Sequence, residues 1–303
     1  MLPIVCRNDR RWRLFSAALQ DLHEHFTAAK RAYDAGGSPH RELREVAAHA
    51  IGLLRAAATS RVLSRCDDKE YSVFDVSGRL SRPYLSDLYE SDPAQFRTDW
   101  DSLVDAAVPG EHRYESRTRQ TNRVLYSAIT AFCACYDVWK PGSRKTPGTF
   151  FEVLLGSILQ RILPGYRRES HVILPEQDEN VSTDIVFRSA SGGPGGLVIP
   201  AKITTRERVV QPFAHQRILD SIFGVGTFKS VLVCVSEMQR DGEDGVNAIC
   251  VPGTIRLFQM HLASMSGICY LDPPSRYLAA DVASVVPVFT LGELLETRLP
   301  RFL

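Results

Sequence analysis

The chain has 303 residues, of which 44% are hydrophobic and 23% are charged, fractions close to the averages of globular proteins. Its 36 Lys and Arg residues nearly balance 35 Asp and Glu residues, and the net charge of +1 excludes a histone-like polybasic binder and an acidic disordered tail protein. No apolar run is long enough to predict a membrane-spanning helix, and the seven cysteines contain no C-x-x-C pair. We therefore expect a cytoplasmic globular protein with reduced cysteines and no structural zinc.

Apolar residues recur at helical spacing along the first half of the chain. Two helices are expected within the first 65 residues, the second over 40–63, and the Gly-Gly-Ser-Pro sequence at 36–39 separates them. Residues 66–115 are mixed and polar, with prolines throughout, and predict no particular element. Two further helices are expected, one over 118–139 and one that begins with Thr149 as its N-cap and ends near residue 163.

Beyond residue 165 the pattern changes to short runs rich in β-branched residues. Strands are expected over 171–174, 182–187, 196–203, 230–236, 247–251, 267–271 and 285–289. Helices are expected over 206–223, 254–265 and 291–299. The order of these elements predicts an α/β (α+β) protein in which a mainly helical region, 1–140, precedes an α/β core, 141–303.

Asp184 and Lys202 lie on two of the expected strands and can meet at one edge of the sheet. A carboxylate can hold Mg²⁺, and a lysine beside the attacking water can stabilise hydroxide or the charge that develops on phosphorus. The pair therefore fits metal-dependent cleavage of a phosphodiester. By spacing alone, an ordinary ion pair at the sheet edge is the simpler interpretation.

Three charged residues, Arg206, Glu207 and Arg208, follow this lysine at an expected junction between strand and helix. Arg can donate two hydrogen bonds to guanine and Glu can accept one from cytosine, so the triplet has the groups that read C·G pairs in the major groove. The alternative is a solvated first helical turn, where Glu207 is favourable near the positive end of the helix dipole. Charge pattern alone leaves both interpretations open.

Asp184, the apolar strand that ends at Lys202, and the Arg-Glu-Arg triplet at 206–208 together resemble the PD-(D/E)xK core of type II restriction endonucleases, and more narrowly its CCGG family. In that family the residue two positions before the lysine is not acidic, and this chain has Pro200 there. The family also carries an R-(D/E)-R element just beyond the lysine that contacts CC and GG dinucleotides, and the triplet matches it position by position.

The chain departs from this family where the second metal-binding carboxylate is expected, on the helix after the lysine. His215 and Gln216 stand there instead of glutamate. Gln216 offers an amide oxygen without formal charge, and His215 is a softer ligand that suits Mg²⁺ poorly. Asp220, one helical turn beyond Gln216, is a further candidate. The identity of the second ligand stays open among these three residues.

Glu152 lies in an otherwise apolar helix and is either part of an exposed stripe or a buried functional acid. Nucleases that this chain resembles place a Glu facing the metal in the helix before the Asp strand, and Glu152 matches that location. The segment 111–170 carries ten Lys or Arg against five acidic residues, a net charge of +5, and could follow a phosphate backbone or form a solvated helix face. The histidines, His25 and His49 among them, are not expected to assemble into a site.

The resemblance implies a restriction-endonuclease-like central mixed β-sheet flanked by helices and a type II endonuclease that cuts double-stranded DNA with Mg²⁺ at a short palindrome containing CC and GG. Asp184, Gln216 and Glu152 would bind the metal, Lys202 would stabilise the nucleophile or the transition state, and residues 206–208 would read bases.

Cleavage of a palindrome implies a homodimer, with higher oligomers open, and residues 1–140 would contribute dimerisation and DNA contacts. The absence of a P-loop sequence predicts no nucleotide cofactor. Two alternatives remain: a nuclease for repair or nicking, and a catalytically impaired DNA-binding protein on the same fold.

Overall fold

The computed structural model of the chain describes residues 10–63, 65–106, 117–143, 145–175 and 179–303, with only the backbone of 10–16, 106, 206 and 207. At its centre lies a mixed sheet of seven strands: β5 (Tyr166–Ile173), β6 (Asn180–Ser189), β7 (Gly196–Ile199), β8 (Ala201–Lys202), β9 (Phe228–Ser236), β12 (Gly267–Asp272) and β13 (Val288–Thr290). The strand order is β13-β12-β9-β7-β6-β5, and β8 also pairs with β9. Strands β5, β6 and β7 are antiparallel neighbours, whereas the other pairs in the sheet are parallel.

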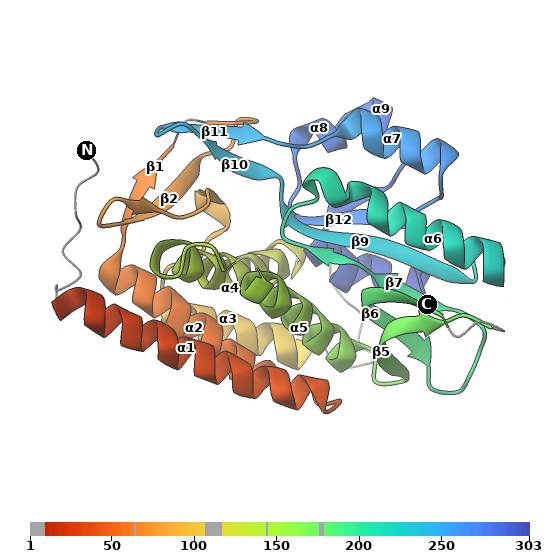
Figure 1. Cartoon of the computed structure of the whole chain (residues 1–303), viewed down its shortest axis with the longest axis horizontal. Coiled ribbons are helices and arrows are strands. Elements are labelled where there is room, and N and C mark those ends of the chain that lie inside the picture. The colour runs from red at the N-terminus through yellow and green to blue at the C-terminus, as the bar shows by residue number, and fades with distance from the viewer. Residues whose placement is uncertain (1–9, 64, 107–116, 144, 176–178) are drawn as a thin grey trace.

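Helices cover both faces of this sheet (Figure 1). One face carries α4 (Thr118–Trp139) and α5 (Lys145–Ile162), and the other carries α6 (Val210–Phe223) and α7 (Pro252–His261). The expected α/β architecture with a central mixed sheet is therefore confirmed. No helix within the described residues is long and apolar enough to cross a membrane, and the cysteines among those residues form no disulfide.

Strand β9 lies in the middle of the sheet and is apolar on both sides. Val231 and Val233 belong to the hydrophobic cluster that contains α4 and α5, whereas Leu232 and Cys234 belong to the cluster that contains Phe213 of α6. Successive side chains of a strand point to opposite faces, so a strand with helices on both sides needs an uninterrupted apolar run. This is the pattern that predicts a buried central strand at 230–236.

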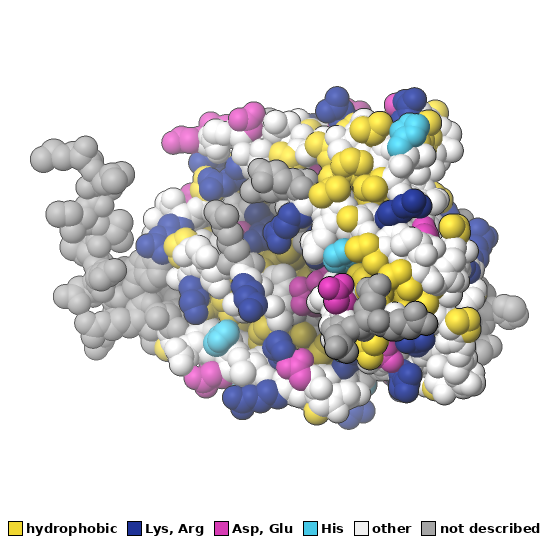
Figure 2. Space-filling model, turned by 45° about the vertical axis from the view of Figure 1, so that its right-hand side comes forward, with side chains coloured by type: hydrophobic (Ala, Val, Ile, Leu, Met, Phe, Trp, Pro, Cys, Tyr) yellow, Lys and Arg dark blue, Asp and Glu magenta, His cyan; other side chains and the backbone are white. Residues whose placement is uncertain are grey.

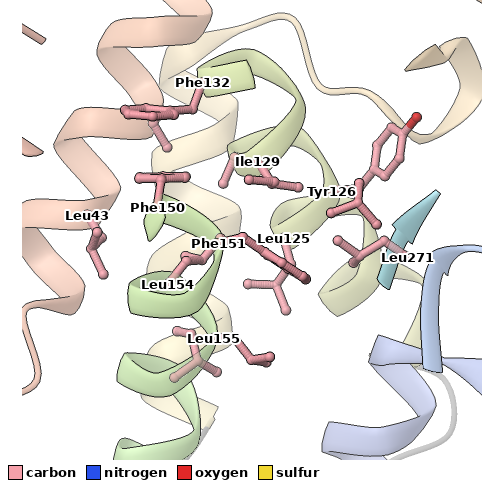
Figure 3. Packing of buried hydrophobic residues seen from close by; sticks show 14 of the residues in the cluster. Leu43, Leu125, Tyr126, Ile129, Phe132, Phe150, Phe151, Leu154, Leu155 and Leu271 are labelled. Atoms are coloured by element: carbon pink, nitrogen blue, oxygen red, sulfur yellow. The ribbon is translucent and has the colours of Figure 1, made fainter. Parts of the chain in front are cut away.

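The N-terminal helices α1 (Arg10–Asp34) and α2 (His40–Ala57) pack on the outer side of α4 and α5, together with α3 (Pro93–Ala106). Figure 3 shows Leu43 of α2 beside Phe150 and Leu154 of α5. The rings of Phe132 and Phe150 stack with centroids 4.0 Å apart. One hydrophobic cluster therefore runs from α1 to the central sheet and crosses residue 140 without a break.

Several expected elements differ from the observed ones. The helix over 40–63 ends at Ala57, and the chain continues into a small antiparallel sheet whose strands lie partly in the segment 66–115. These strands are β1 (Thr59–Val62), β2 (Tyr71–Val76), β3 (Arg79–Leu80) and β4 (Tyr84–Leu85). A hairpin of β10 (Met238–Asp241) and β11 (Gly245–Ala248) replaces the strand expected over 247–251. Such short strands carry too few residues to display a period of two.

The helix expected over 291–299 is less regular than expected: α10 (Leu291–Glu293) continues as a π turn (Leu294–Arg298) and a 3₁₀ turn (Leu299–Arg301). Two short helices that were not expected, α8 (Ser275–Leu278) and α9 (Ala280–Ala283), precede it. Short 3₁₀ turns also form at Ser86–Leu88 and Arg206–Val209. Helix α5 starts at Lys145 rather than after Thr149. Pro147 is compatible with this start because it lies in the first turn, where the backbone N–H that proline lacks would have no partner within the helix.

Gly156 allows α1 to lie close against α5. A Cβ atom at this position would stand 1.9 Å from Tyr33 Oη and 2.7 Å from its Cζ. The Tyr33 ring cannot easily move aside, because the Arg168 guanidinium lies 3.3 Å above its centroid and donates a hydrogen bond to its carbonyl oxygen. The contact between the two helices therefore depends on glycine.

We expect Gly156→Ala to lower the free energy of unfolding by about 1–3 kcal/mol, the usual cost of overpacking. Gly148 is a matched control on the same helix, since a Cβ there meets no atom within 4 Å. Gly148→Ala should raise stability by up to about 1 kcal/mol through helix propensity. Equilibrium urea denaturation measures both values, and a Gly156→Ala variant as stable as the wild type would contradict the close contact.

Candidate active site

Asp184 and Lys202 form an ion pair between β6 and β8. Lys202 Nζ and the backbone N–H of Ala201 each donate a hydrogen bond of 2.7 Å to Asp184 Oδ2. Strand β7 pairs with β6 as far as Ile199, and after Pro200 the chain pairs only with β9. This change of partner leaves the Ala201 N–H available to the carboxylate. The pair expected from the sequence is thus brought together, with side chains 20% and 17% exposed.

Glu152 of α5 is half-buried and lies in the electrostatic field of this pair. Burial and, after it, the negative charge of Asp184 raise the pKa of its carboxyl to about 7, against the opposing effect of Lys202. Glu152 accepts no hydrogen bond from any described residue. Two carboxylates close together, one of them without a partner, are destabilised unless a cation is added. The residues present therefore fit a divalent cation with oxygen ligands.

Two cavities meet at Lys202. The first, the active-site cavity, has a volume of about 400 Å³ and is lined by Asp184, Pro200, Lys202 and His215 among others. The second, the wide cleft, has a volume of about 950 Å³ and contains Glu152 and Lys202 in its lining. Lys202 therefore contributes to the lining of both spaces, while its ammonium group pairs with Asp184 and acts electrostatically on Glu152.

Of the three candidates for the second ligand, His215 is the one that lines the active-site cavity together with the ion pair. The pKa of His215 is lowered by burial first and by Lys202 second, with Asp184 opposing. Gln216 is buried and lines neither cavity, and its Nε2 donates hydrogen bonds of 2.7 Å to Asp220 Oδ1 and 3.0 Å to the Phe228 carbonyl. Gln216 Oε1 is buried without a hydrogen-bond partner among the described residues.

The Arg-Glu-Arg triplet begins beside the active site. The side chains of Arg206 and Glu207 lie outside the described residues, and their backbone forms the first part of a 3₁₀ turn. Arg208 is exposed and lines the wide cleft. The residue before the triplet, Thr205, is fixed because its N–H and hydroxyl donate hydrogen bonds of 3.0 and 2.5 Å to Glu237 Oε1.

Glu237 is a residue that sequence reasoning missed. It is fully buried directly after β9, and it also accepts a hydrogen bond of 2.9 Å from Tyr270 Oη. An acidic residue immediately after an apolar central strand is the signal that could have identified it, since a charge at that place requires partners. Glu237 holds the start of the triplet rather than any reacting group.

Basic side chains of the wide cleft come from segments far apart in the sequence. Those that line it are Arg82, Lys145, Lys202, Arg208 and Arg240. Figure 2 shows one face of the molecule, on which Lys and Arg side chains lie around the middle, next to Asp and Glu side chains. Of the described basic residues in the +5 segment 111–170, Lys145 lines the cleft, whereas Arg123 forms an ion pair with Glu90. Residues 111–116 of that segment lie outside the described part of the chain.

The chain is similar in structure to known nucleases. The crystal structure of the type IIP restriction endonuclease Kpn2I matches with a TM-score of 0.84 and 38% sequence identity, over 93% of this chain and 97% of that chain. The complex of the restriction endonuclease PspGI with substrate DNA matches with a TM-score of 0.42 and 13% identity, over 68% and 90%, and supports no inference. No protein-family model and no curated protein matches the sequence.

Proposed function

The chain belongs to the type II restriction endonucleases, which hydrolyse DNA at specific sites, and from this membership we propose that it cleaves double-stranded DNA with Mg²⁺ at a short palindrome containing CC and GG. The observation that carries the proposal is the meeting of Glu152, Asp184 and Lys202 at one edge of the sheet, with the Glu152 carboxylate unpartnered among the described residues. The Arg-Glu-Arg triplet at 206–208 lies next to this site and supports a recognition sequence that contains CC and GG dinucleotides.

Asp184 and Glu152 are the residues that would hold Mg²⁺, and the ion would supply positive charge and a water of lowered pKa. Lys202 places its ammonium where the attacking oxygen bonds to phosphorus and the opposite P–O bond breaks, and it stabilises the negative charge of that transition state. His215 is neutral at pH 7 because its pKa lies below the ordinary value, so it adds no charge to the site.

Arg206, Glu207 and Arg208 are the proposed base-reading residues. Glu237 fixes the backbone of Thr205 immediately before them, so the triplet starts from a rigid point. Because Arg208 and Glu152 line the same cleft, one duplex in that cleft would meet the reading groups and the reacting groups together. Direct readout requires such a fixed distance between base edges and the scissile phosphate.

A palindrome presents the same bases and the same phosphate on both strands, so two identical active sites related by a twofold axis are needed to cut both. We propose a homodimer on this ground, with residues 1–140 contributing to dimerisation and DNA contacts and 141–303 forming the catalytic core. Light scattering of the protein bound to a palindromic duplex in Ca²⁺ should give two chains per duplex, and one chain per duplex would contradict the dimer.

Digestion of phage DNA tests the function directly. With Mg²⁺ we expect discrete fragments whose ends all map to one palindrome that contains CC and GG. Random fragments would indicate a nuclease without site specificity, and ends that share a palindrome without these dinucleotides would overturn the assigned role of the triplet. A protein that shifts DNA in Ca²⁺ but never cuts in Mg²⁺ or Mn²⁺ would be an impaired DNA-binding relative.

Two neighbouring substitutions distinguish His215 from Gln216 as the second ligand. His215→Ala should slow single-turnover cleavage by about 10- to 100-fold with little change in stability, because the side chain lines the active-site cavity. Gln216→Ala should instead lower the free energy of unfolding by about 1–3 kcal/mol, because it leaves the buried Phe228 carbonyl without its donor. A Gln216→Ala variant that is stable but cleaves slowly would identify Gln216, rather than His215, as the second metal ligand.

A further inference from the structure

A second group of potential metal ligands lies on the N-terminal helices, outside both cavities. Asp21 and His25 of α1 and His49 of α2 each place one donor atom within 4.8 Å of the other two. The expectation that the histidines do not assemble is therefore wrong for this pair. Residues four apart on a helix share a face, and the packing of α2 against α1 brings His49 to that face.

The spacing of these atoms suits coordination better than hydrogen bonding. His25 Nδ1 lies 3.7 Å from Asp21 Oδ1, and His49 Nδ1 lies 3.6 Å from Asp21 Oδ2. Both separations are too long for hydrogen bonds. Ligands about 2.0–2.1 Å from a tetrahedral metal lie roughly 3.4 Å apart, and each imidazole lies near that distance from one of the two oxygens of Asp21, with all three donors within 4.8 Å of one another.

The donor set determines the kind of metal. Two imidazoles and one carboxylate suit Zn²⁺ and similar transition metals, whereas Mg²⁺ prefers oxygen ligands alone. The side chains of Asp21 and His25 are 54% and 62% exposed, so a fourth position is open to water. The positive charge of Arg97 acts on His49 and would oppose a nearby cation. The Arg97 guanidinium is, however, already paired with Glu45 at 2.9 Å, which offsets that charge.

We propose that Asp21, His25 and His49 form a Zn²⁺ site that clamps α1 to α2. The ion binds the folded chain because the three ligands come together only when the two helices pack. Binding then stabilises the folded chain, and the stabilisation grows with the logarithm of the free Zn²⁺ concentration once this exceeds the dissociation constant. The site is separate from the proposed catalytic centre and does not depend on the proposed function.

Titration of the purified full-length chain with Zn²⁺ in an excess of Mg²⁺ tests this proposal, since Mg²⁺ occupies oxygen sites. We expect one Zn²⁺ per chain, in the wild type and equally in Asp184→Asn. The affinity should fall at least 10-fold in His25→Ala and in His49→Ala. His261→Ala, which removes an exposed histidine outside the cluster, should bind as the wild type does.

Thermal unfolding gives a second reading that does not involve activity. Zn²⁺ should raise the melting temperature of the wild type and of His261→Ala but not that of His49→Ala. Because His25 is largely exposed, His25→Ala should melt like the wild type when Zn²⁺ is removed, which separates loss of a ligand from loss of folding. Unchanged Zn²⁺ affinity in both cluster variants, or no Zn²⁺ bound in Asp184→Asn, would overturn the site.

Discussion

Lys202→Ala should slow DNA cleavage by about 10²- to 10³-fold or more while leaving DNA binding and folding intact. The ammonium group lies 2.7 Å from Asp184 Oδ2 and lines both cavities, so it is the described cation best placed to meet charge that develops on a phosphate. Loss of one preorganised group of this kind typically costs that much in rate. Single-turnover cleavage in Mg²⁺ measures the first effect, and gel shifts in Ca²⁺ measure binding.

Lys229→Ala is the matched control for this substitution. Lys229 lies on β9, which pairs with the strand of Lys202, but its Nζ donates to the Arg301 carbonyl at 3.1 Å and it lines neither cavity. Its replacement should leave the cleavage rate nearly unchanged. A Lys202→Ala variant that cuts like the control would show that the Asp184–Lys202 pair is only the ordinary ion pair that spacing alone suggests.

The Asp184–Lys202 pair could be predicted because it depends on local register. Strands β6 and β7 are adjacent in sequence and antiparallel, and Ile185 pairs with Ile199. The acid just before Ile185 and the lysine just after this pairing must therefore come close. The position of Glu152 was predictable from the resemblance alone, since an isolated acid in an apolar helix fits an exposed stripe equally well.

The choice between His215 and Gln216 depends on which face of α6 meets the sheet. Phe213, Gln216 and Leu219 are all buried in α6 at a spacing of three residues. This apolar stripe predicts that Gln216 faces the sheet and that its neighbour His215 lies to one side. A polar residue inside the stripe is a signal for a buried amide with backbone partners, as observed at the Phe228 carbonyl.

Contacts between distant segments could not be predicted from one sequence. His25 and His49 meet because two helices pack face to face, and no pattern within either helix records its partner. The strands between residues 59 and 85 were missed for a similar reason. All four are two to six residues long, and their pairing rather than their composition defines them.

Glu152→Gln should stabilise the metal-free protein at and above neutral pH and should remove its response to divalent cations. The pKa of Glu152 is about 7 in the folded chain, against an ordinary value of 4.5. As pH rises from 4.5 to 7, the unfolded chain releases this proton first, so the folded chain holds more protons and the free energy of unfolding falls. Below pH 4.5 Glu152 is protonated in both the folded and the unfolded chain, so it does not lower the free energy of unfolding. Above pH 7 it is ionised in both, and the loss of stability that its buried charge causes has reached its full size.

Glutamine is neutral at every pH and escapes this loss of stability. The variant should therefore match the wild type near pH 4 and exceed it by on the order of 2 kcal/mol at pH 8, after allowance for screening by water. Urea denaturation of EDTA-treated protein at several pH values measures the difference. Glu243→Gln, at an exposed residue in the β10–β11 turn, should show no such trend.

Divalent cations complete the test of Glu152. Ca²⁺ at pH 8 should raise the melting temperature of the wild type, because it relieves the repulsion between Glu152 and Asp184 and binds only when both are assembled. The same addition should have little effect on Glu152→Gln, which keeps Asp184 but loses the second carboxylate of the proposed metal site. A wild-type protein whose stability does not fall between pH 4.5 and 7, or a variant that responds to Ca²⁺ as strongly as the wild type, would remove Glu152 from the proposed metal site.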